Sequence, residues 1–399
     1  LQILHNEQGK LPKGTARDYP LFPNRGFMLD VARKFFTMDY LKQYVKILSF
    51  YKMNEFQIHL NDNGFPQFFG DDWNRTYAAF RLESERFPGL TAKDGSYSKQ
   101  EFIDLQRMGL EYGVRIIPEI DIPAHSLAFA HYKPEIASRK YGMDHLDLYK
   151  KETYQFVDSL LDEYLSGDNP VFIGDLHIGT DEYNKKEAEQ YRYFTDRYLK
   201  FVEKYGKNVR MWGGLKWLPG KTPVKAEGVT VNAWSYDWVD PVVSLQDGYK
   251  LINTCDTYLY IVPAAGYYRD FLDHQWIYEK WSPWIMNRKQ TLPEGTPGVL
   301  GGMFAVWNDK CGNGISEQDV HLRSFPAMQV LAEKLWKGEN KNVTYEAFAK
   351  LCKTTPEAPG INLLGKVPAE TALTEAGKEL SFNGKEAVST PLQEVGYPY

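Results

Sequence analysis

The sequence predicts a (β/α)8 barrel with a short N-terminal arm and a non-helical C-terminal appendage. Three observations predict this fold. Eight short strand-like runs recur along the chain, separated by stretches with helical spacing or by long loops. Polar residues follow the end of nearly every run, at the edge where barrels of this class carry functional groups. A doubly wound sheet would need a glycine-rich phosphate-binding turn after an early strand, and the sequence has none.

Composition bounds the fold and its partners. With 399 residues, of which 43% are hydrophobic and 25% charged, the chain can bury the core of one large domain. The net charge of −5 and the absence of a basic run argue against nucleic acid as a partner. No apolar run approaches the length of a membrane span. Aromatic residues make up 15% of the chain, and Trp and Tyr stack on the apolar faces of sugars, although an aromatic core would give the same value.

Three regions are expected along the chain. Residues 1–24 form a polar, proline-containing arm, and residues 25–340 form the barrel. Residues 341–399 form the appendage, in which 379–382 and 386–390 are possible strands at the start of a β-sandwich. The chain begins at Leu1 and shows no signal peptide, so we expect processing or trimming of a longer protein.

The first half of the predicted barrel has four strands and three helices. Apolar alternation or short apolar runs mark the strands, and apolar residues three and four apart mark the helices. A capping box at Ser98 and Glu101 opens the second helix. A long loop, 61–97, follows the second strand, and loops of this length are usually functional. The strands are Gly26–Asp30, Glu55–Leu60, Val114–Ile120 and Leu176–Gly179, and the helices are Met38–Met53, Ser98–Tyr112 and Lys151–Leu165.

The second half is less regular. Two helices are expected, at Lys185–Tyr205 and Ser316–Lys337, and a second long stretch, 258–298, is crowded with Trp and Tyr. The four strands are Asn208–Trp212, Thr230–Trp234, Tyr249–Thr254 and Gly301–Trp307. Three cysteines, an odd number with no zinc spacing, can be three free thiols or one disulfide and one thiol.

Two adjacent carboxylates, Asp181 and Glu182, stand where the fourth strand ends. Because repulsion and burial keep both from ionising cheaply, one of them should have a raised pKa. Such a carboxylic acid can protonate the leaving oxygen of a glycoside. An acidic strand end neutralised by a helix N-terminus or an Arg would look the same in sequence.

The polar strand ends together resemble those of family 20 glycoside hydrolases, the β-N-acetylhexosaminidases. The resemblance follows the family's order from residue 25 to about 337. It rests on Arg25-Gly-Phe-Met-Leu-Asp30, His59-Leu-Asn-Asp62, Pro118-Glu-Ile-Asp-Ile-Pro-Ala-His125, His177-Ile-Gly-Thr-Asp-Glu182, Trp212-Gly213, and Gly301-Gly302 leading to Trp307-Asn-Asp309.

The resemblance implies a retaining mechanism in which the 2-acetamido group of the substrate attacks the anomeric carbon and forms an oxazoline. This family is an exception to the scheme with a carboxylate nucleophile. Glu182 would be the general acid and then the general base. Asp181 would accept the acetamido N–H and balance the oxazolinium charge, and Tyr258 would hold the acetamido oxygen.

Other positions carry over as substrate-binding or supporting residues. The expected walls of the sugar pocket and its hydroxyl-binding residues are Trp212, Trp234, Trp307, Arg25, Asp309 and Asp62. Asp121 and His125 are expected to orient Glu182 and tune its pKa. His59 and His177 are expected to be satisfied buried histidines, and no metal or cofactor is implied.

Three departures from the family pattern stand out. Tyr260 replaces an acidic residue two positions after Tyr258, so either another group orients the acetamide or the match is shifted at the seventh strand. Asp309 replaces the usual Glu and is shorter by one methylene. The usual small N-terminal α/β domain is absent from these residues.

The favoured function is an exo-β-N-acetylhexosaminidase that acts on the terminal N-acetylhexosamine of an oligosaccharide or glycoconjugate outside the cytoplasm. A lacto-N-biosidase-like enzyme, which releases a disaccharide, would need a wider pocket, and Arg25 argues against it. A catalytically inactive glycan-binding module is the third hypothesis, and the presence of Asp181, Glu182 and Tyr258 argues against it.

Overall fold

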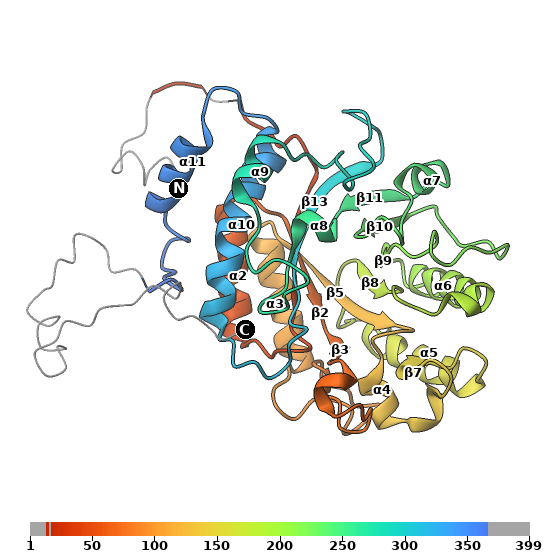
Figure 1. Cartoon of the computed structure of the whole chain (residues 1–399). Coiled ribbons are helices and arrows are strands. Elements are labelled where there is room, and N and C mark those ends of the chain that lie inside the picture. Colours follow the sequence, from red (N-terminus) through yellow and green to blue (C-terminus); the bar gives the residue numbers. More distant parts are fainter. Residues whose placement is uncertain (1–12, 16, 366–399) are drawn as a thin grey trace, which may run out of the picture.

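The computed structural model describes residues 13–15 and 17–365, and a closed parallel barrel lies at the centre of this part of the chain (Figure 1). Eight strands close the barrel in the order β1-β2-β5-β8-β9-β10-β11-β13, with β13 paired back to β1. The strands are β1 (Asn24–Asp30), β2 (Glu55–His59), β5 (Arg115–Ile122), β8 (Leu176–Gly179), β9 (Val209–Trp212), β10 (Val229–Ala233), β11 (Lys250–Asn253) and β13 (Val299–Val306). The predicted barrel is confirmed, and all eight predicted strands belong to it.

Alternation along the strands divides the core into two layers. Phe27 on β1 stacks on Phe56 of β2 and on Phe304 of β13, at centroid distances of 5.3 and 4.6 Å, and these rings face Tyr44 of the neighbouring helix. Side chains of alternate residues point to opposite sides of a strand, so Asp30 of β1 and His59 of β2 point away from the side of Phe27 and Phe56. Both are fully buried. The outer face of the barrel under the helices is therefore apolar, and polar side chains point into the barrel near the carboxyl ends of the strands.

Helices cover the barrel unevenly. The long helices are α2 (Met38–Phe50), α3 (Lys99–Glu111), α5 (Lys151–Leu165), α6 (Ala188–Glu203) and α10 (Glu317–Lys337), each close to its prediction. The capping box of Ser98 and Glu101 is present at the start of α3. Between β9 and β10 the connection 213–228 has no helix, and the β10–β11 connection has only the short α7 (Pro241–Gln246). The loops above β9 to β11 thus occupy the side of the barrel with the least helical cover.

The connections between the barrel strands contain further small elements, of which η3 falls at the start of a predicted helix and the others were not predicted. The loop after β2 pairs β3 (Asn61–Asn63) with β4 (Ala78–Phe80) as an antiparallel hairpin. The others are the 3-10 helices η1 (Pro66–Phe69), η2 (Pro134–Ile136) and η3 (Lys185–Glu187), the strands β6 (Ala137–Ser138), β7 (Gly142–Leu146) and β12 (Tyr260–Ile261), and the helices α4 (Leu127–Tyr132), α8 (Asp256–Leu259) and α9 (His274–Glu279). All are too short to show a sequence period.

The C-terminal appendage begins with a helix, which corrects the expected non-helical character at its start. Helix α11 (Tyr345–Thr354) lies on the outside of α9 and α10 (Figure 1), where Gln329 of α10 donates to the Cys352 carbonyl. The possible strands 379–382 and 386–390 lie outside the described residues. All three cysteines are described and are free thiols, which decides between the two alternatives. Among the described helices, none combines the length and apolarity that crossing a bilayer requires.

Candidate active site

A pocket of about 210 Å³ opens at the carboxyl ends of the barrel strands. Its volume lies below the roughly 300–1,000 Å³ of sites for drug-sized ligands, so it suits one sugar ring. Carboxylates, an arginine, a histidine and six aromatic rings share its wall. The lining residues are Arg33, Phe65, His125, Asp181, Glu182, Trp234, Tyr260, Tyr267, Tyr268, Trp307 and Asp309.

The turn after β8 places Asp181 and Glu182 in this pocket through an unusual backbone. Gly179, Thr180 and Glu182 have φ values of 67°, 75° and 50°. A β-branched residue such as Thr180 is strained in the left-handed region. Glycine is required at 179, since a Cβ there would lie 1.7 Å from Oδ1 of Asp121. The surrounding structure therefore imposes this turn, and the turn aims both carboxylates at the pocket.

Asp181 lines the pocket and has a buried acceptor without a partner in the described part of the chain. The residue is 7% exposed, and its Oδ1 has no hydrogen-bond partner within the described residues. Burial, and the charge of Glu182, raise the pKa of Asp181 to about 6, although the charge of His125 acts in the opposite direction. A buried acceptor without a donor is destabilising unless a ligand supplies the donor.

Glu182 stands at the end of a relay of charged groups. Its Oε2 lies 3.2 Å from Nε2 of His125, and Nδ1 of His125 lies 2.9 Å from Oδ1 of Asp62. Burial lowers the pKa of His125, but the carboxylates of Asp62, Asp121 and Asp181 outweigh it, so the pKa is raised well above its usual value. Burial raises the pKa of Glu182, but the hydrogen bond and the charge of His125 outweigh burial, so the pKa lies below its usual value. In the free pocket one proton therefore resides mainly on His125, next to Glu182.

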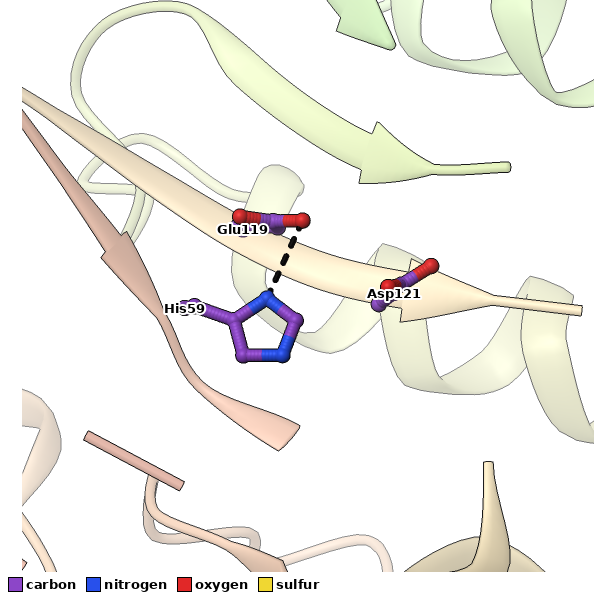
Figure 2. A group of neighbouring side chains, drawn as sticks. All are labelled: His59, Glu119 and Asp121. Atoms are coloured by element: carbon purple, nitrogen blue, oxygen red, sulfur yellow. Dashed lines mark ion pairs between the residues drawn. The ribbon is translucent and has the colours of Figure 1, made fainter. Parts of the chain in front are cut away.

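A buried layer of charged and aromatic residues lies beneath the pocket. Figure 2 shows His59 of β2 directed at Glu119 of β5, with Asp121 two residues farther along the same strand. Nε2 of His59 lies 2.7 Å from Asp62, and its Nδ1 lies 3.1 Å from Glu119. Trp212 donates its Nε1–H to Glu119 at 2.6 Å and lies under the ring of Trp307, at 5.6 Å. This layer fixes the floor on which the pocket residues rest.

The group of His59, Glu119 and Asp121 is close enough to hold a metal ion, as is the group of Asp121, His125 and Asp181. The protonation of the two histidines explains these clusters without one. Burial lowers the pKa of His59, but Glu119 and Asp62 raise it well above its usual value. A protonated imidazole has no lone pair for a metal, so an ion at either cluster would have to displace a proton from its histidine.

The far wall of the pocket combines Arg33, Asp309 and Tyr267. The Arg33 side chain is 4% exposed, and its Nη1 lies 3.2, 2.8 and 3.5 Å from carboxylate oxygens of Asp30, Asp62 and Asp309. Tyr267 donates its hydroxyl to Oδ2 of Asp309 at 2.8 Å. Burial raises the pKa of Asp309, although Arg33 lowers it. This wall offers a guanidinium, a carboxylate and a hydroxyl to a ligand rich in hydroxyl groups.

Aromatic rings close the remaining sides. Tyr260 of β12 lies 5.8 Å from Trp307 and 5.5 Å from Tyr268, and Tyr268 donates its hydroxyl to Asp256 at 3.2 Å. Burial raises the pKa of Tyr260 well above its usual value, so its hydroxyl stays a proton donor. Trp234 is anchored by donation of its Nε1–H to the Gly213 carbonyl at 2.8 Å.

Comparison with known proteins agrees with this geometry. Residues 22–339 match the family described as "Glycosyl hydrolase family 20, catalytic domain". The chain belongs to glycosyl hydrolase family 20. Among curated relatives, beta-hexosaminidase subunit B2 of Dictyostelium discoideum is 27% identical over 84% of this chain, and a beta-hexosaminidase of Akkermansia muciniphila is 28% identical over 56%. The chain spans only 60% and 50% of the lengths of these two relatives.

Solved structures share the fold. The beta-N-acetylhexosaminidase of Bacteroides fragilis aligns with a TM-score of 0.66 at 21% identity, and covers 84% of this chain and 70% of its own. Dispersin B aligns with a TM-score of 0.61 at 20% identity, and covers 78% of this chain and 99% of its own.

Two residues carried over from the family 20 pattern lie away from the pocket. Arg25, at the start of β1, donates to the carbonyls of Phe22 and Lys52 and packs over Trp336, so it cannot clamp a sugar at the opposite end of the barrel. Tyr258 on α8 stacks on Trp276 at 4.4 Å and does not line the pocket. The predicted role of Arg25 is therefore wrong, and that of Tyr258, which lies outside the pocket wall, stays a prediction. Arg33 and Tyr260 stand in the pocket instead.

Four further residues are near the pocket without lining it. Trp212 and Asp62 were expected to touch substrate, but both are fully buried, one under Trp307 and one behind His125, which corrects that expectation. Asp121 accepts the Thr180 N–H at 3.2 Å and supports the strained turn. His177 accepts the Gly179 N–H, and burial lowers its pKa to about 4, so it is a neutral buried histidine.

The sequence carried some signal for the residues that were missed. Arg33 follows the end of β1 by three positions, whereas Arg25 precedes most of the strand, and functional groups of a barrel belong at the carboxyl end. Tyr260 stood at the position already noted as a departure. Phe65, Tyr267 and Tyr268 sit in the two long loops, where no period marks which aromatic ring turns inward.

Proposed function

We propose that this family 20 chain is a retaining exo-β-N-acetylhexosaminidase that removes a terminal N-acetylhexosamine by substrate-assisted catalysis. The observation that carries the proposal is the unused Oδ1 of Asp181, a buried acceptor in the pocket wall next to Glu182. An acetamido N–H supplies the donor that this atom lacks. The names of the relatives, which are beta-hexosaminidases, support the same substrate class.

In the first step Glu182 protonates the glycosidic oxygen as its bond to C1 breaks. The acetamido carbonyl oxygen of the substrate forms the new bond to C1, and the positive charge spreads over the oxazolinium ring. Asp181 accepts the N–H of that ring and stabilises its charge. The contact between His125 and Glu182 lets the shared proton move to Glu182 before it is donated.

In the second step water replaces the leaving group. Glu182, now a carboxylate, takes a proton from the water, the water oxygen attacks C1, and the oxazolinium ring opens to the acetamide. Two displacements at C1 give net retention of configuration. Tyr260 takes the part expected of Tyr258, because its hydroxyl is a donor that can hold the acetamido carbonyl oxygen in the attacking position.

The size of the pocket supports release of a monosaccharide. About 210 Å³ accommodates one sugar ring, and the linked side chains of Arg33, Asp309 and Tyr267 form one polar wall of the pocket. No observation favours the disaccharide-releasing alternative. Arg25 lies at the other end of the barrel and cannot exclude a disaccharide, but Arg33 stands in the pocket wall. The location outside the cytoplasm stays a prediction.

The test compares four substrates: nitrophenyl β-N-acetylglucosaminide, its N-trifluoroacetyl analogue, nitrophenyl β-glucoside and nitrophenyl β-lacto-N-bioside. We expect fast hydrolysis of the first, a large drop for the fluorinated analogue because its carbonyl is a weaker nucleophile, and none for the glucoside. Equal rates on the first two would point to a protein nucleophile. Release from the lacto-N-bioside alone would mean that the pocket admits a disaccharide.

A further inference from the structure

An aromatic path leads from the pocket to the surface over β9 and β10. The wall residue Trp234 contacts Trp238 at a centroid distance of 5.5 Å, and Trp238 contacts Trp217 at 5.2 Å. Trp217 is 37% exposed at the outer end of the path. Trp234 is buried and Trp238 is half-buried, so the path runs outward from the pocket wall to the exposed ring of Trp217.

Three lysines lie against aromatic rings of these loops, one against Trp217 and two against Tyr236. Nζ of Lys185 lies 4.7 Å from the Trp217 ring, and the Nζ atoms of Lys216 and Lys289 lie 3.4 and 4.5 Å from the ring of Tyr236. Lys216 also donates to the Tyr236 carbonyl. Within 13–15 and 17–365, none of the three forms an ion pair with a carboxylate, unlike Lys52, Lys99 or Lys140 elsewhere. Their charges are therefore localised by cation–π contacts and left without an acidic partner.

The chemistry of the pocket fixes which part of a substrate meets this surface. The reasoning rests on the proposed function: the terminal sugar occupies the end formed by Arg33 and Asp309, and the bond that breaks lies beside Glu182. The leaving sugar must therefore extend past Glu182. Lys185 follows Glu182 by three residues in the same loop, and Trp217 lies against it. The aromatic path and its lysines thus line the exit taken by the leaving group.

We propose that the surface of Trp217, Trp238, Tyr236, Lys185, Lys216 and Lys289 binds a negatively charged sugar as the leaving group. The apolar face of a pyranose covers exposed Trp surface, and a carboxylate or sulfate on the same ring pairs with the lysines. The enzyme then prefers N-acetylhexosamine linked to an acidic sugar over the same unit linked to a neutral one. Exposed ion pairs are individually weak, so two or three together give a preference of about tenfold.

The test uses one trisaccharide in two forms. The first is N-acetylglucosamine-β-1,4-glucuronate-β-1,3-N-acetylglucosamine, and the second has the uronate carboxyl reduced to the alcohol, so the two differ only in that charge. We expect kcat/KM to be about tenfold higher for the uronate at low salt, and the ratio to fall as salt screens the exposed charges. A ratio of one or below, or cleavage of neither trisaccharide by an enzyme that hydrolyses the nitrophenyl substrate, would overturn the inference. Loss of nitrophenyl hydrolysis itself would instead overturn the proposed function.

Two sets of variants separate charge from stacking. Replacement of Lys185, Lys216 and Lys289 by Gln should bring the uronate-to-alcohol ratio close to one. A control replaces Lys204 and Lys250, two exposed lysines near the opposite end of the barrel, by Gln, and should leave the ratio at about ten. It is compared with the replacement of any two of the three lysines, which removes the same charge. Trp217→Ala should lower kcat/KM for both trisaccharides by the same factor. If the control variant lowers the ratio as much as the three-lysine variant does, net charge rather than this surface sets the preference, and the inference fails.

Discussion

The two ends of the barrel are built from the same strands and are both charged, but they treat charge in opposite ways. At the amino end Glu55 of β2 is fully buried and accepts two hydrogen bonds from Arg210 at 2.6 and 2.8 Å, while Arg210 also pairs with Asp175. Arg115 and Asn24 donate to the same carboxylate. Burial raises the pKa of Glu55, but Arg210 and Arg115 bring it below normal, so this end is a neutralised ionic network.

At the carboxyl end acidic groups outnumber their partners. Arg33 is shared by Asp30, Asp62 and Asp309, while Asp181 keeps an acceptor without a partner within the described residues and a pKa of about 6. The turn that positions Asp181 and Glu182 contains two non-glycine residues with positive φ, Thr180 and Glu182. Both ends of the barrel bury charged groups, so burial of charge is not itself a mark of function in this molecule. What separates the two ends is whether the buried groups are already satisfied or are held ready for a ligand.

The largest effect on chemistry should come from Glu182→Gln. Loss of general acid–base catalysis should lower kcat/KM on an N-acetylglucosamine disaccharide by roughly 10²–10⁴-fold, with little change in melting temperature, since the side chain is 49% exposed. A nitrophenyl substrate, whose leaving group needs less protonation, should lose less. Steady-state assays on both substrates check this. Equal losses on the two would mean that Glu182 acts by some route other than proton donation.

Glu55→Gln should show the reverse pattern, stability lost and chemistry kept. It leaves the Arg210 guanidinium buried with only Asp175 as a charged partner, and breaking a buried ion pair costs about 3–5 kcal/mol. Denaturant unfolding should show this loss, while kcat measured below the unfolding transition stays at the wild-type value. A fall in kcat at full foldedness would show that the two ends of the barrel are coupled.

Asp181→Asn should raise stability and lower activity together. Because burial raises the pKa of Asp181 from 3.8 to about 6, the native state binds more protons than the unfolded state between these values, and rising pH removes stability across that window. Removal of the titrating group should therefore stabilise the protein by up to about 3 kcal/mol at neutral pH, and by progressively less toward pH 4.

The same variant should lose turnover by roughly 10²–10³-fold through loss of charge stabilisation. In the wild type, kcat/KM should fall as Asp181 is protonated below about pH 6. Unfolding curves at pH 4, 6 and 8, measured alongside activity, test both effects. A variant less stable than the wild type at pH 8 would contradict the view of Asp181 as a strained acceptor.

The comparison also shows what the sequence could and could not predict. Five long helices were predictable because each repeats a helical period over many residues, and eight strands because each is a short apolar or alternating run between turns or helices. Asp181 and Glu182 were predictable because they directly follow a strand. The error at Arg25 arose because a motif match located an arginine on β1 without saying which end of the barrel it faces.

Residues on the long loops were beyond prediction for another reason. Tyr258 and Tyr260 are two positions apart, and the turn of α8 into β12, rather than any period, decides which ring enters the pocket. Tyr267 reaches Asp309 across 42 residues of sequence, and no local pattern records that contact. The conformation of the loop, which no local sequence pattern predicts, decides which of these aromatic rings enters the pocket.

The smallest expected effect on kcat/KM comes from changes to Tyr267 and Asp309, which together stand where the family usually has a Glu. Asp309 is shorter than the Glu expected in the family, and the Tyr267 hydroxyl, 2.8 Å from its Oδ2, extends the polar wall in its place. Tyr267→Phe should lower kcat/KM by about fivefold, the size of one hydrogen bond, and should change the ratio between the 4-epimers N-acetylglucosaminide and N-acetylgalactosaminide. Asp309→Glu in the Tyr267→Phe background should restore part of the loss, because the longer carboxylate reaches the vacated position. Absence of this rescue, with both single variants fully folded, would show that Tyr267 only packs at the mouth, and that the hydroxyl-binding wall is Arg33 and Asp309 alone.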